Sequence, residues 1–591
     1  MAEYKLEVTT GTMKYAGTMD YIHATLFGTE GQSERTELDN FGFDALSGMT
    51  RTYTIKTTTS LGKLLLLKVE KDPFFILSED EWYCSKIVVT TPEGEAILFP
   101  CYRWISRGEL VELRGGKAMK VFEDDCPLLI DHRKKELTSK KRLYQTDLCD
   151  FQIFRWAITD EKIPHRIHYT DIDELPAEVR FSLSKEHEIR FTKKLTQNVV
   201  FCNIFICDQK IMDKIPTREY DGKPLQAAAG LCLFYMNPEN KLMPIAIQLH
   251  QQPSEQNPIF LPSDSETDWL LAKIFVKSAD AMEYQAIYHL MGTHFLAEVF
   301  AVAALRSFPV IHPLYKFLIP HFRYTLHINT LSRTILFGHK GALNTSTLGY
   351  EGMTELIRRG LSEMTYSSLC LPENITARGL ESVPNFYYRD DGLKLWNIIN
   401  SFVRKVVEHF YPSDNDVVKD TELQDWISEI FTHGFLANKL AGFPTTFDAV
   451  EEVVKFITML IFTVTAQHAA LNNGQFDFLS WMPNGSLLTR RPPPTTKGQS
   501  SVETILETFP NIGETVKFAA QAVVLSEKYS DMVLLGAYTE EWFQEPALKQ
   551  MIKEFQADLS NLTDIITVRN SELELPYTYL SPTEIENSVT I

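Results

Sequence analysis

The sequence predicts a multidomain protein in which a small N-terminal all-β sandwich, residues 1–112, precedes a large, mainly α-helical domain, residues 113–591. Residues 1–112 alternate polar and apolar side chains with a period of two and are punctuated by Gly, Asp and Asn. From Asp124 onward, apolar residues recur at helical spacing, as over 268–306 and 423–440, between loops that contain proline. With 591 residues, 44% of them hydrophobic, the chain is long enough to bury a large core.

The predicted strands follow one another through the first hundred residues. Each combines alternation with a turn residue at its end, which is the pattern of a strand with one buried face. The stretches are YKLEVTTG at 4–11, YIHATLFG at 21–28, TYTIKTTTS at 52–60, KLLLLKVEKD at 63–72 and EWYCSKIVVTTPEGEAILF at 81–99.

Composition excludes several classes of function. The formal net charge of -19 argues against nucleic-acid binding, because neutralising phosphates requires clustered Lys and Arg, and clusters such as HRKK at 132–135 are short. The eight cysteines include no CxxC pair, so neither a zinc ribbon nor a disulfide framework is indicated. The N-terminus lacks a signal pattern, and the apolar run FITMLIFTVTA at 456–466 is too short to span a bilayer. We therefore expect a cytoplasmic protein.

Two histidines lie five residues apart in an apolar stretch of the helical domain, AIYHLMGTHFLAEVF at 286–300. On a regular α-helix this spacing separates His289 and His294 by about 140° around the axis, so the rings cannot share a site. A π-type turn, with hydrogen bonds from residue i to i+5, would bring both rings onto one face, and Gly292 eases that distortion. From the pair alone, a shared functional site and hydrogen-bonded core histidines both stay open.

A second apolar helix and the chain terminus add candidate ligands. In TAQHAALNNGQFDF at 465–478, His468 and Asn472 are four residues apart and lie on one helical face. The terminal SVTI is uncharged and mainly apolar, unlike the disordered tail usual at chain ends, so it can tuck inward with the α-carboxylate of Ile591. Three imidazoles, an amide oxygen and a carboxylate form a ligand set without thiolate, which suits non-haem iron better than structural zinc.

Five segments, in order, resemble hallmark segments of the lipoxygenase family, specifically its animal type. They are HLMGTHFLAEVF at 289–300, HPLYKFLIPHFRYTLHINTLSRTIL at 312–336, QHAALNNGQFDFLSWMP at 467–483, RPPPTTKG at 491–498 and the terminal ENSVTI. FPCYRWI at 99–105 is similar to that family's junction between domains. The resemblance runs almost from end to end and favours a shared site over core histidines.

The resemblance implies a PLAT-type sandwich followed by a catalytic domain with one non-haem iron. By motif match, the iron ligands are His289, His294, His468, Asn472 and the carboxylate of Ile591. The implied reaction inserts O2 into a polyunsaturated fatty acid such as arachidonate, after hydrogen abstraction from a doubly allylic CH2 gives a pentadienyl radical. Asn472 stands where some relatives carry His and is the weaker ligand.

The resemblance also implies residues of the substrate pocket and residues around the ligands. Ser332 stands where relatives carry Ala or Gly, a choice associated with stereochemistry, and Leu336 is expected over the bend of the substrate. Positions that set pocket depth fall at or near Ala281, Thr345 and Ser346. Their small side chains hint at a deep pocket, and simple variation in packing explains them nearly as well. Gln285 and Gln475 are expected to orient ligands or bound water. Leu331 replaces an Arg proposed in some relatives to hold the carboxylate, so no anion anchor is named.

Two loops of the β-domain, GTMD at 17–20 and DNFGFD at 39–44, are rich in oxygen ligands, which suit Ca2+. Calcium-dependent docking on membranes is similar to what some relatives do, and Phe41 and Phe43 are available to insert into lipid. Ordinary Asp and Asn turns explain the same residues, so both interpretations stay open. We expect reversible membrane association through this domain. The candidate calcium ligands are Gly17, Asp20, Asp39 and Asn40.

The resemblance breaks near residues 191–203. VRFSLSKEHEIRF at 179–191 runs through a handful of residues into NIFICDQKIMDKIPT at 203–217. In the family, a long helical insert separates these segments and includes an arched helix that shields the pocket. Loss of that wall would admit water and leave apolar surface exposed on neighbouring helices.

Three functions therefore stay open. The leading hypothesis is an iron dioxygenase that converts fatty acids to hydroperoxides. Segments such as FYYRDDGLKLW at 386–396 are most similar to the epidermal branch, in which one member type acts as a hydroperoxide isomerase and makes epoxyalcohols through the same iron. The third is an inactive shortened isoform that only docks on membranes. The sequence predicts no oligomeric state.

Overall fold

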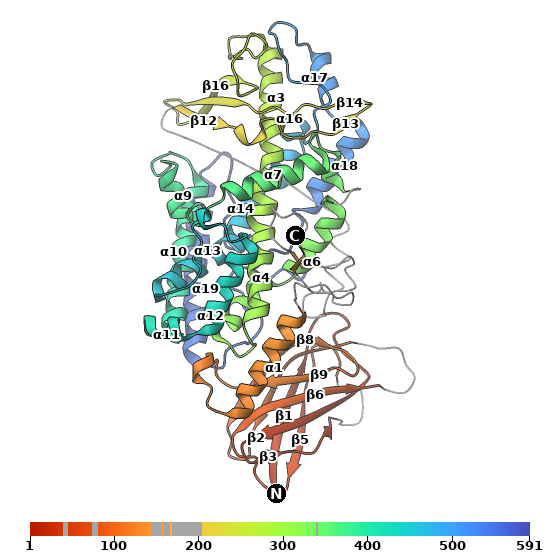
Figure 1. Ribbon diagram of the computed structural model, residues 1–591, viewed down its shortest axis with the longest axis vertical. Helices are drawn as coiled ribbons and strands as arrows, with labels where there is room; N and C mark the ends of the chain where they lie inside the picture. Colours follow the sequence, from red (N-terminus) through yellow and green to blue (C-terminus); the bar gives the residue numbers. More distant parts are fainter. Residues whose placement is uncertain (39–44, 74–80, 144–155, 158–165, 168–203, 338–340) are drawn as a thin grey trace.

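Two antiparallel sheets form the predicted N-terminal sandwich, shown in red and orange in Figure 1. The computed structural model describes residues 1–38, 45–73, 81–143, 156–157, 166–167, 204–337 and 341–591. One sheet has the order β5 (Thr50–Thr57), β1 (Ala2–Thr10), β7 (Trp82–Thr90), β8 (Ala96–Ile105). The other has the order β3 (Gly31–Gln32), β2 (Tyr21–Gly28), β6 (Leu64–Asp72), β9 (Leu110–Arg114), with β4 (Thr36–Glu37) also on β2.

Alternation in the sequence decides which side chains enter the sandwich core. In β1, Tyr4, Leu6 and Val8 are buried, whereas the intervening Lys5 and Glu7 face outward. Burying one face of each sheet against the other removes apolar surface from water and stabilises the pair. The expected domain boundary at residue 112 falls inside β9, which pairs with β6.

Helix α1 (Pro127–Leu143), after the short η1 (Val121–Glu123), joins the sandwich to the helical domain. Its Leu129 packs on Leu65 and Leu66 of the sandwich. On the other side, the buried Arg133 pairs with Asp124 and, at 2.6 Å, with Glu422 of the helical domain. A guanidinium paired with two carboxylates can be buried because its charge is neutralised. Through Leu129 on one side and Arg133 on the other, α1 therefore links both domains.

Small sheets stand at the far end of the helical domain from the sandwich (Figure 1). The three-stranded sheet carries exposed apolar side chains, among them Ile204 (58% exposed), Ile206 and Met243. Exposed apolar surface was expected on helices beside the missing insert; besides this sheet, helical residues such as Leu506 (63% exposed) and Ile512 (85%) also expose apolar side chains. The strands at this end are β12 (Ile204–Asp208), β15 (Leu231–Met236) and β16 (Leu242–Gln248), with the pair β13 (Glu219–Tyr220) and β14 (Lys223–Pro224). A further pair, β10 (Trp156–Ala157) and β11 (Arg166–Ile167), lies elsewhere, since β11 contacts the helix Leu296–Ser307.

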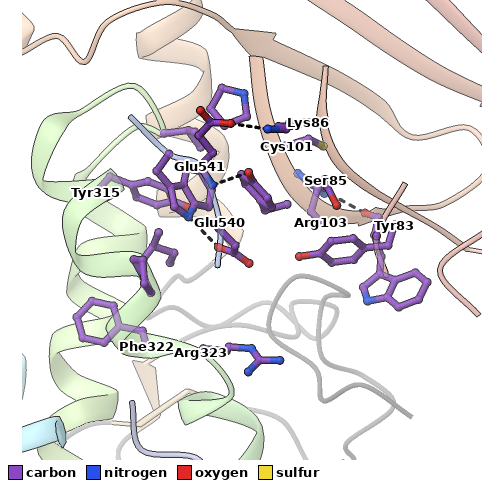
Figure 2. Close-up of a pocket in the computed structure, with 18 of the residues that line it drawn as sticks. Tyr83, Ser85, Lys86, Cys101, Arg103, Tyr315, Phe322, Arg323, Glu540 and Glu541 are labelled. Atoms are coloured by element: carbon purple, nitrogen blue, oxygen red, sulfur yellow. Dashed lines mark hydrogen bonds and ion pairs between the residues drawn. The ribbon is translucent and has the colours of Figure 1, made fainter. Parts of the chain in front are cut away.

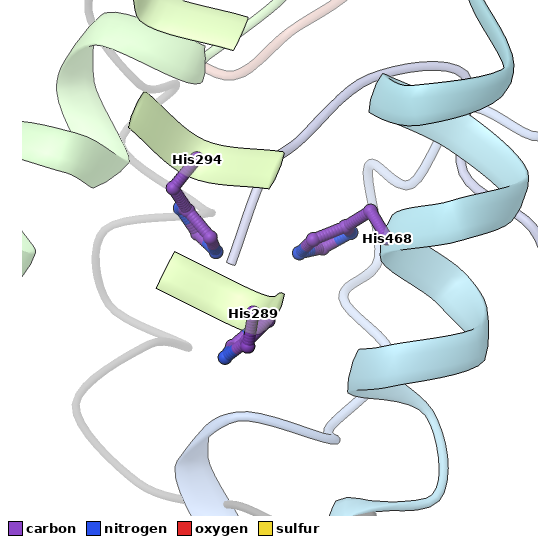
Figure 3. Close-up of side chains that lie close together, drawn as sticks. All are labelled: His289, His294 and His468. Carbon is purple, nitrogen blue, oxygen red and sulfur yellow. The ribbon is translucent and has the colours of Figure 1, made fainter. Parts of the chain in front are cut away.

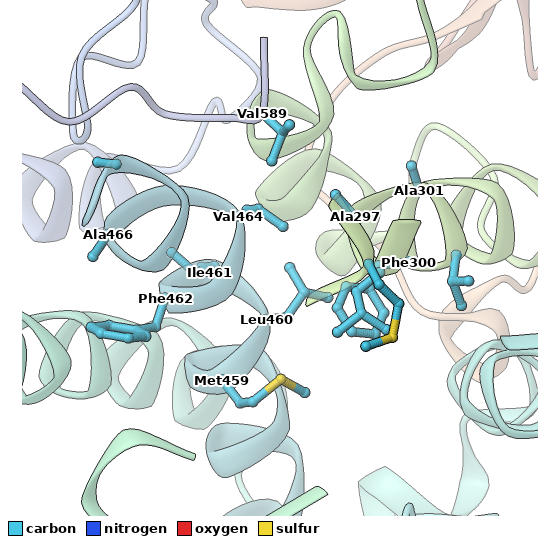
Figure 4. Packing of buried hydrophobic residues seen from close by; sticks show 14 of the residues in the cluster. Ala297, Phe300, Ala301, Met459, Leu460, Ile461, Phe462, Val464, Ala466 and Val589 are labelled. Carbon is cyan, nitrogen blue, oxygen red and sulfur yellow. The ribbon is translucent and has the colours of Figure 1, made fainter. Parts of the chain in front are cut away.

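One continuous helical stretch runs through the centre of the helical domain and comprises α3 (Glu266–Glu283), η5 (Tyr284–Phe295) and α4 (Leu296–Ser307). Ser265 caps its start, since its hydroxyl accepts a hydrogen bond from the backbone of Asp268. A second stretch comprises α13 (Val450–Phe462), η11 (Thr463–Gln467) and α14 (His468–Asn472). Figure 4 shows Phe300 of the first stretch beside Leu460 of the second, within the apolar core that also takes in Val589.

The other helices pack around these two stretches. They are η4 (Lys210–Met212), α5 (Pro313–Leu318), η6 (Ile319–Phe322), α6 (Thr325–Ser332), η7 (Arg333–Phe337), η8 (Ala342–Thr345), α7 (Gly349–Glu363), α8 (Tyr366–Leu369), α9 (Leu371–Ala377), α10 (Tyr387–Phe410), α11 (Asp414–Lys419), α12 (Thr421–Glu429), η9 (Ile430–Gly434), η10 (Lys439–Ala441), α15 (Gln475–Leu479), α16 (Met482–Gly485), α17 (Val502–Thr508), α18 (Ile512–Val524) and α19 (Pro546–Ser571).

Two helical stretches, Glu266–Ser307 and Val450–Leu479, are long and apolar enough to cross a membrane by length and composition. The apolar run at 456–466, expected to be too short to span a bilayer, lies within the second of these stretches. In the folded chain, 89% and 83% of their most apolar windows are buried, as in core helices of globular domains.

Candidate metal centre

A π-helical segment brings His289 and His294 onto one face of the central stretch. Residues Tyr284–Phe295 form η5, in which a wider turn replaces the α-helical one. The ring centroids of the two histidines lie 4.9 Å apart. The π-type turn that the two rings need in order to share one face at a five-residue spacing is therefore present.

His468 completes a group of three imidazoles. It is the first residue of α14, directly after the π-helical η11, and projects from the facing stretch toward the other two rings (Figure 3). Its ring centroid is 5.5 Å from that of His289 and 5.1 Å from that of His294. One nitrogen of each ring lies within 4.8 Å of the others, a spacing that fits coordination of one metal ion.

Burial lowers the pKa of two of these imidazoles, His289 and His294. His289, His294 and His468 are 3%, 2% and 5% exposed. Burial lowers the pKa of His294 to about 4, although the hydrogen bond from His294 to Asn329 opposes the shift. Burial, reinforced by the repulsion that a protonated His294 or His468 would exert, lowers the pKa of His289 well below its usual value. Neutral imidazole is the form that binds a metal, so the donors fit a cation.

Asn329 on α6 fixes the tautomer of His294. Its Nδ2 donates to the carbonyl of His294 at 2.7 Å and to the carboxylate of Glu298 at 2.9 Å, and both partners only accept. Its Oδ1 therefore faces His294 Nδ1 at 2.9 Å, and that nitrogen must carry the hydrogen. The Nε2 lone pair is left free for a metal, while Arg333 pairs with Glu298 and neutralises it. No local pattern in the sequence marks Asn329, Glu298 or Arg333 for this role.

The two predicted amides, Gln285 and Gln475, lie beside His289. Gln285 Oε1 is 3.2 Å from His289 Nδ1, and Gln285 Nε2 donates to Gln475 Oε1, also at 3.2 Å. Gln475 Nε2 in turn donates to Asn472 Oδ1 at 2.6 Å. The chain of amides therefore connects His289 with Asn472 and orients both side chains.

The chain terminus tucks inward to the imidazoles. A terminal oxygen of Ile591, a residue that is 3% exposed, lies 3.0 Å from His468 Nε2. His321 holds the preceding residues, since its Nδ1–H donates to the carbonyl of Asn587 at 2.9 Å and its Nε2 accepts from Tyr538. Thr325 also donates to the carbonyl of Val589. These contacts fix the position of the α-carboxylate.

Comparisons with known proteins agree with this architecture. The Lipoxygenase family model matches residues 217–579, and the PLAT/LH2 domain model matches residues 4–112. The chain belongs to the lipoxygenase family. It is 36% identical to human "Hydroperoxide isomerase ALOXE3" and 34% identical to human "Polyunsaturated fatty acid lipoxygenase ALOX15B", with 100% of each chain covered.

Solved lipoxygenase structures share the fold. The structure of coral 8R-lipoxygenase, whose title names calcium activation through a C2-like domain, gives a TM-score of 0.92 at 27% identity with both chains fully covered. A lipoxygenase in complex with arachidonate gives 0.91 at 27% identity, again over both whole chains. The family and the two-domain fold predicted from the sequence are therefore confirmed, as is membership among oxidoreductases of this family.

This lipoxygenase is shorter than its relatives. The alignment with the human hydroperoxide isomerase spans 721 positions, of which about 130 have no counterpart among the 591 residues here. The predicted junction near 191–203 lies outside the described residues.

The predicted pocket residues do not line the narrow cavity beside the amides. Ala281 is buried in α3, and Leu336 is half-buried in η7. Ser332 is buried and its hydroxyl donates to the carbonyl of Asn329 at 2.9 Å. Arg218 donates to the carbonyls of Thr345 and Ser346 at 2.8 and 2.7 Å. Their role in a substrate pocket stays a prediction.

The narrow cavity next to Gln285 and Gln475 contains a residue that sequence reasoning missed. Its volume is about 10 Å3, the space of one water molecule, and its other walls are largely apolar. Gln521 of α18 lines it, is 8% exposed, and has no hydrogen-bond partner for Oε1 within the described part of the chain. Its neighbours in the sequence gave no sign of an unpaired amide near the imidazoles.

The structure describes only part of the predicted calcium site. Both oxygens of Asp20 accept from Arg107 at 2.6 Å, and Lys71 lies 3.3 Å from one of them. Calcium would have to displace these cations, so Asp20 is committed to an ion pair in this structure. The backbone N–H of Gly17 donates to Ser47. Asp39 and Asn40 lie outside the described residues.

A second group of metal-type side chains, His312, Asp420 and Glu422, is a structural cluster. His312 Nδ1 accepts from the backbone N–H of Leu314, so its Nε2 carries the hydrogen and donates to Asp420 at 3.0 Å. Neither ring nitrogen keeps a free lone pair. Arg133 forms an ion pair with Glu422, and the cluster thereby joins α1 to the helical domain.

Proposed function

We propose that this lipoxygenase is a fatty-acid dioxygenase in which one non-haem iron is held by His289, His294, His468, Asn472 and the carboxylate of Ile591. The observation that carries the proposal is the convergence of three buried imidazoles with nitrogens within 4.8 Å of one another. The approach of Ile591 to His468, at 3.0 Å, supports the terminal carboxylate as a further ligand.

Iron, when bound, supplies the redox chemistry needed to oxygenate a doubly allylic carbon. The chain's own residues have three tasks. Asn329 and Gln285 keep the Nδ1 nitrogens of His294 and His289 in hydrogen bonds, which presents their Nε2 nitrogens to the metal. His321 holds the terminal segment. The apolar core around the imidazoles limits access of water.

Hydroperoxide isomerase activity is the second candidate. Human, rat and mouse proteins with this name are 36%, 34% and 35% identical to the chain over its full length. Proteins named as fatty-acid lipoxygenases match almost as well, at 34–35% identity. The same set of imidazoles would serve either reaction.

We also propose that the N-terminal domain docks reversibly on membranes from the cytoplasm, with calcium as a candidate cofactor. PLAT domains are of a lipid-binding or membrane-binding type, and two solved lipoxygenases have titles that name calcium dependence. Tyr15 and Leu46, on loops near Gly17, are exposed apolar side chains available for such a surface.

Iron content and two activity assays test the catalytic proposals. Purified protein is assayed for iron per chain, for conjugated-diene formation from arachidonate and O2, and for consumption of an arachidonate hydroperoxide. Stoichiometric iron with diene formation supports dioxygenase activity, whereas iron with hydroperoxide consumption alone supports the isomerase. Iron without either reaction, or no iron, supports the inactive isoform. His468→Ala should abolish iron binding and His409→Ala, at an exposed position on α10, should not.

A further inference from the structure

One residue with a strained backbone lies between two segments on which the metal centre depends. Tyr324 has a φ of 64° and a ψ of -7°, in the left-handed region that residues with a β-carbon rarely adopt. It directly precedes α6 and follows η6 after one residue, Arg323. Such a conformation costs free energy, persists only where the surroundings enforce it, and is concentrated at functional sites. A specific set of contacts must therefore hold Tyr324.

The residues on both sides of Tyr324 hold the last residues of the chain. Four hydrogen bonds connect residues 320–325 with residues 587–589. The pairs are His321 Nδ1 with the carbonyl of Asn587 (2.9 Å), Asn587 Nδ2 with the carbonyl of Pro320 (3.3 Å), Ser588 Oγ with the carbonyl of Arg323 (2.9 Å) and Thr325 Oγ1 with the carbonyl of Val589 (3.3 Å). Figure 1 marks the end of the chain beside α6. A change of backbone direction at Tyr324 would therefore move the partners of the residues that precede Ile591.

The helix that begins after Tyr324 also orients a proposed ligand. The carbonyl of Tyr324 accepts a hydrogen bond from the backbone N–H of Ile328 at 2.9 Å, so the direction of α6 is set at this residue. Asn329, on the same helix, holds His294 Nδ1 at 2.9 Å. The bend at Tyr324 therefore determines the position of the side chain that fixes the tautomer of His294.

Arg323 and Asp531 hold the side chain of Tyr324. The Tyr324 hydroxyl donates to Asp531 Oδ2 at 2.8 Å and accepts from Arg323 Nη2 at 2.9 Å. Arg323 also donates to the carbonyl of Asp531 at 2.7 Å, and its guanidinium carbon lies 4.3 Å from the centre of the Tyr324 ring. Hydrogen bonds to charged groups are the stronger class. The left-handed backbone can relax only if these contacts break.

Asp531 belongs to a second segment that holds the chain terminus. The carbonyl of Val533 accepts from the backbone N–H of Asn587 at 2.8 Å, and the backbone N–H of Leu535 donates to the carbonyl of Ile585 at 2.9 Å. The hydrogen bond between Tyr324 and Asp531 therefore joins the two segments, residues 320–325 and 531–535, that hold the terminus.

These residues border the cleft between the two domains. The cleft has a volume of about 1330 Å3, and Arg323, Tyr324 and Asp531 line it. Figure 2 shows Arg323 at the wall that the helical domain forms, with its guanidinium extending into the cleft. The side chains of Arg323 and Asp531 are 27% and 21% exposed. Because water can replace a hydroxyl removed at this place, a substitution tests the loss of the contact without leaving a closed cavity.

We propose that Tyr324 and Asp531 are positioning residues of the metal centre, whose hydrogen bond holds the α-carboxylate of Ile591 and the imidazole of His294 in place. They act on Ile591 through residues 587–589 and on His294 through Asn329. The contact with Asp531 offsets the cost of the left-handed backbone, so the bend is kept as long as the hydroxyl is held. The inference rests on the proposed iron centre, because two of its proposed ligands are the groups that are positioned.

The first test measures how fast a chelator removes iron from loaded, full-length protein at a temperature where all variants are folded. Tyr324→Phe keeps the ring and removes the hydroxyl. We expect iron to leave about 10-fold faster than from the wild type, at the lower end of the range for partners that orient metal ligands.

Two further variants separate the backbone from the side chain. Tyr324→Ala and Tyr324→Gly both lose the ring and the hydroxyl, but only glycine adopts the left-handed conformation without a penalty. We expect Tyr324→Ala to release iron fastest and Tyr324→Gly to recover part of the wild-type rate. Loss of side-chain packing alone would affect the two variants equally.

The second test needs no metal. A carboxypeptidase is added to metal-free, folded protein, and mass spectrometry follows the loss of Ile591. We expect Tyr324→Phe and Tyr324→Ala to lose Ile591 faster than the wild type, because the terminal segment leaves its partners more often. Tyr324→Gly should lose Ile591 more slowly than Tyr324→Ala.

Tyr411→Phe is the matched control. Tyr411 is buried, and its hydroxyl donates to the carboxylate of Asp420 at 2.7 Å, as that of Tyr324 does to Asp531. Its φ of -122° is an ordinary extended value. Urea unfolding should show a comparable loss of stability for Tyr411→Phe and Tyr324→Phe, whereas Tyr411→Phe should leave iron release and the loss of Ile591 at their wild-type rates.

The proposal is overturned if Tyr324→Phe matches the wild type in either test, if Tyr324→Gly is as fast as Tyr324→Ala, or if Tyr411→Phe has the same effect as Tyr324→Phe. Wild-type protein that binds no iron would overturn the iron centre itself and, with it, the role of Tyr324. None of the other outcomes does so, because in each of them the wild type still carries iron.

Discussion

The most direct test of how the metal centre is organised is the variant Asn329→Ala. The substitution removes three buried hydrogen bonds, of 2.9 Å to His294 Nδ1, 2.7 Å to the carbonyl of His294 and 2.9 Å to the carboxylate of Glu298. Two neutral bonds and one to a charged group are together worth about 3–5 kcal/mol of the free energy of unfolding. We expect metal-free Asn329→Ala to be less stable by about that amount.

The same variant should bind iron more weakly, because His294 loses the acceptor that keeps the hydrogen on Nδ1. Loss of a hydrogen-bond partner of a ligand typically lowers metal affinity about 10–100-fold. The assay combines urea unfolding of metal-free protein with the rate at which a chelator removes iron from the loaded protein. A general loss of stability would affect the first measurement and not the second at a temperature where both proteins are folded.

Asn400→Ala is the matched control. Asn400 on α10 donates a single hydrogen bond, at 3.1 Å, to Thr458 on α13. Its loss should cost about 1 kcal/mol of unfolding free energy and leave iron release unchanged. If Asn329→Ala releases iron at the wild-type rate, or if Asn400→Ala accelerates release equally, the argument from the tautomer of His294 is wrong.

Three other predictions concern the terminus, a buried histidine and the unpaired amide. Deleting Ile591 should remove bound iron and turnover, and retention of both would exclude its carboxylate as a ligand. Burial lowers the pKa of His321 from 6.5 to about 4, so the unfolded chain takes up a proton that the folded chain does not as pH falls through this window. The unfolding free energy should therefore decrease by up to about 3 kcal/mol as the pH falls. His321→Gln should flatten the dependence of the unfolding free energy on pH, and an unchanged dependence would contradict the argument. Gln521→Leu should raise the unfolding free energy of metal-free protein by about 1–3 kcal/mol, because an unpaired buried amide is removed, and calorimetry showing a loss would count against the unpaired state.

Local features of the fold could be predicted because neighbours in the chain determine them. Alternation in β1 placed Tyr4 and Leu6 inside and Lys5 outside, since successive side chains of a strand face opposite sides of a sheet. The spacing of His289 and His294 brings both rings onto one face only in a wider helical turn, and η5 has that turn. His468 and Asn472 likewise lie one helical turn apart in α14.

Contacts between distant residues depended on tertiary packing. Asp20 was interpreted from its loop as a candidate calcium ligand, but Arg107, 87 residues away, binds both its oxygens in the fold. The acceptor that orients His294 comes from Asn329, 35 residues further along the chain, on another helix. The spacing of residues along the sequence does not reveal such pairs, because they form only when two elements pack at a particular angle and register.

The sequence by itself determined the two-domain organisation and the lipoxygenase family and named the candidate ligands, because these depend on residue type and short-range spacing. Only the tertiary structure decided that the three imidazoles converge and that His321 and Thr325 hold the segment ending at Ile591. The physical reason is that burial, hydrogen-bond direction and charge neutralisation are properties of surroundings, which residues far apart in the chain create together.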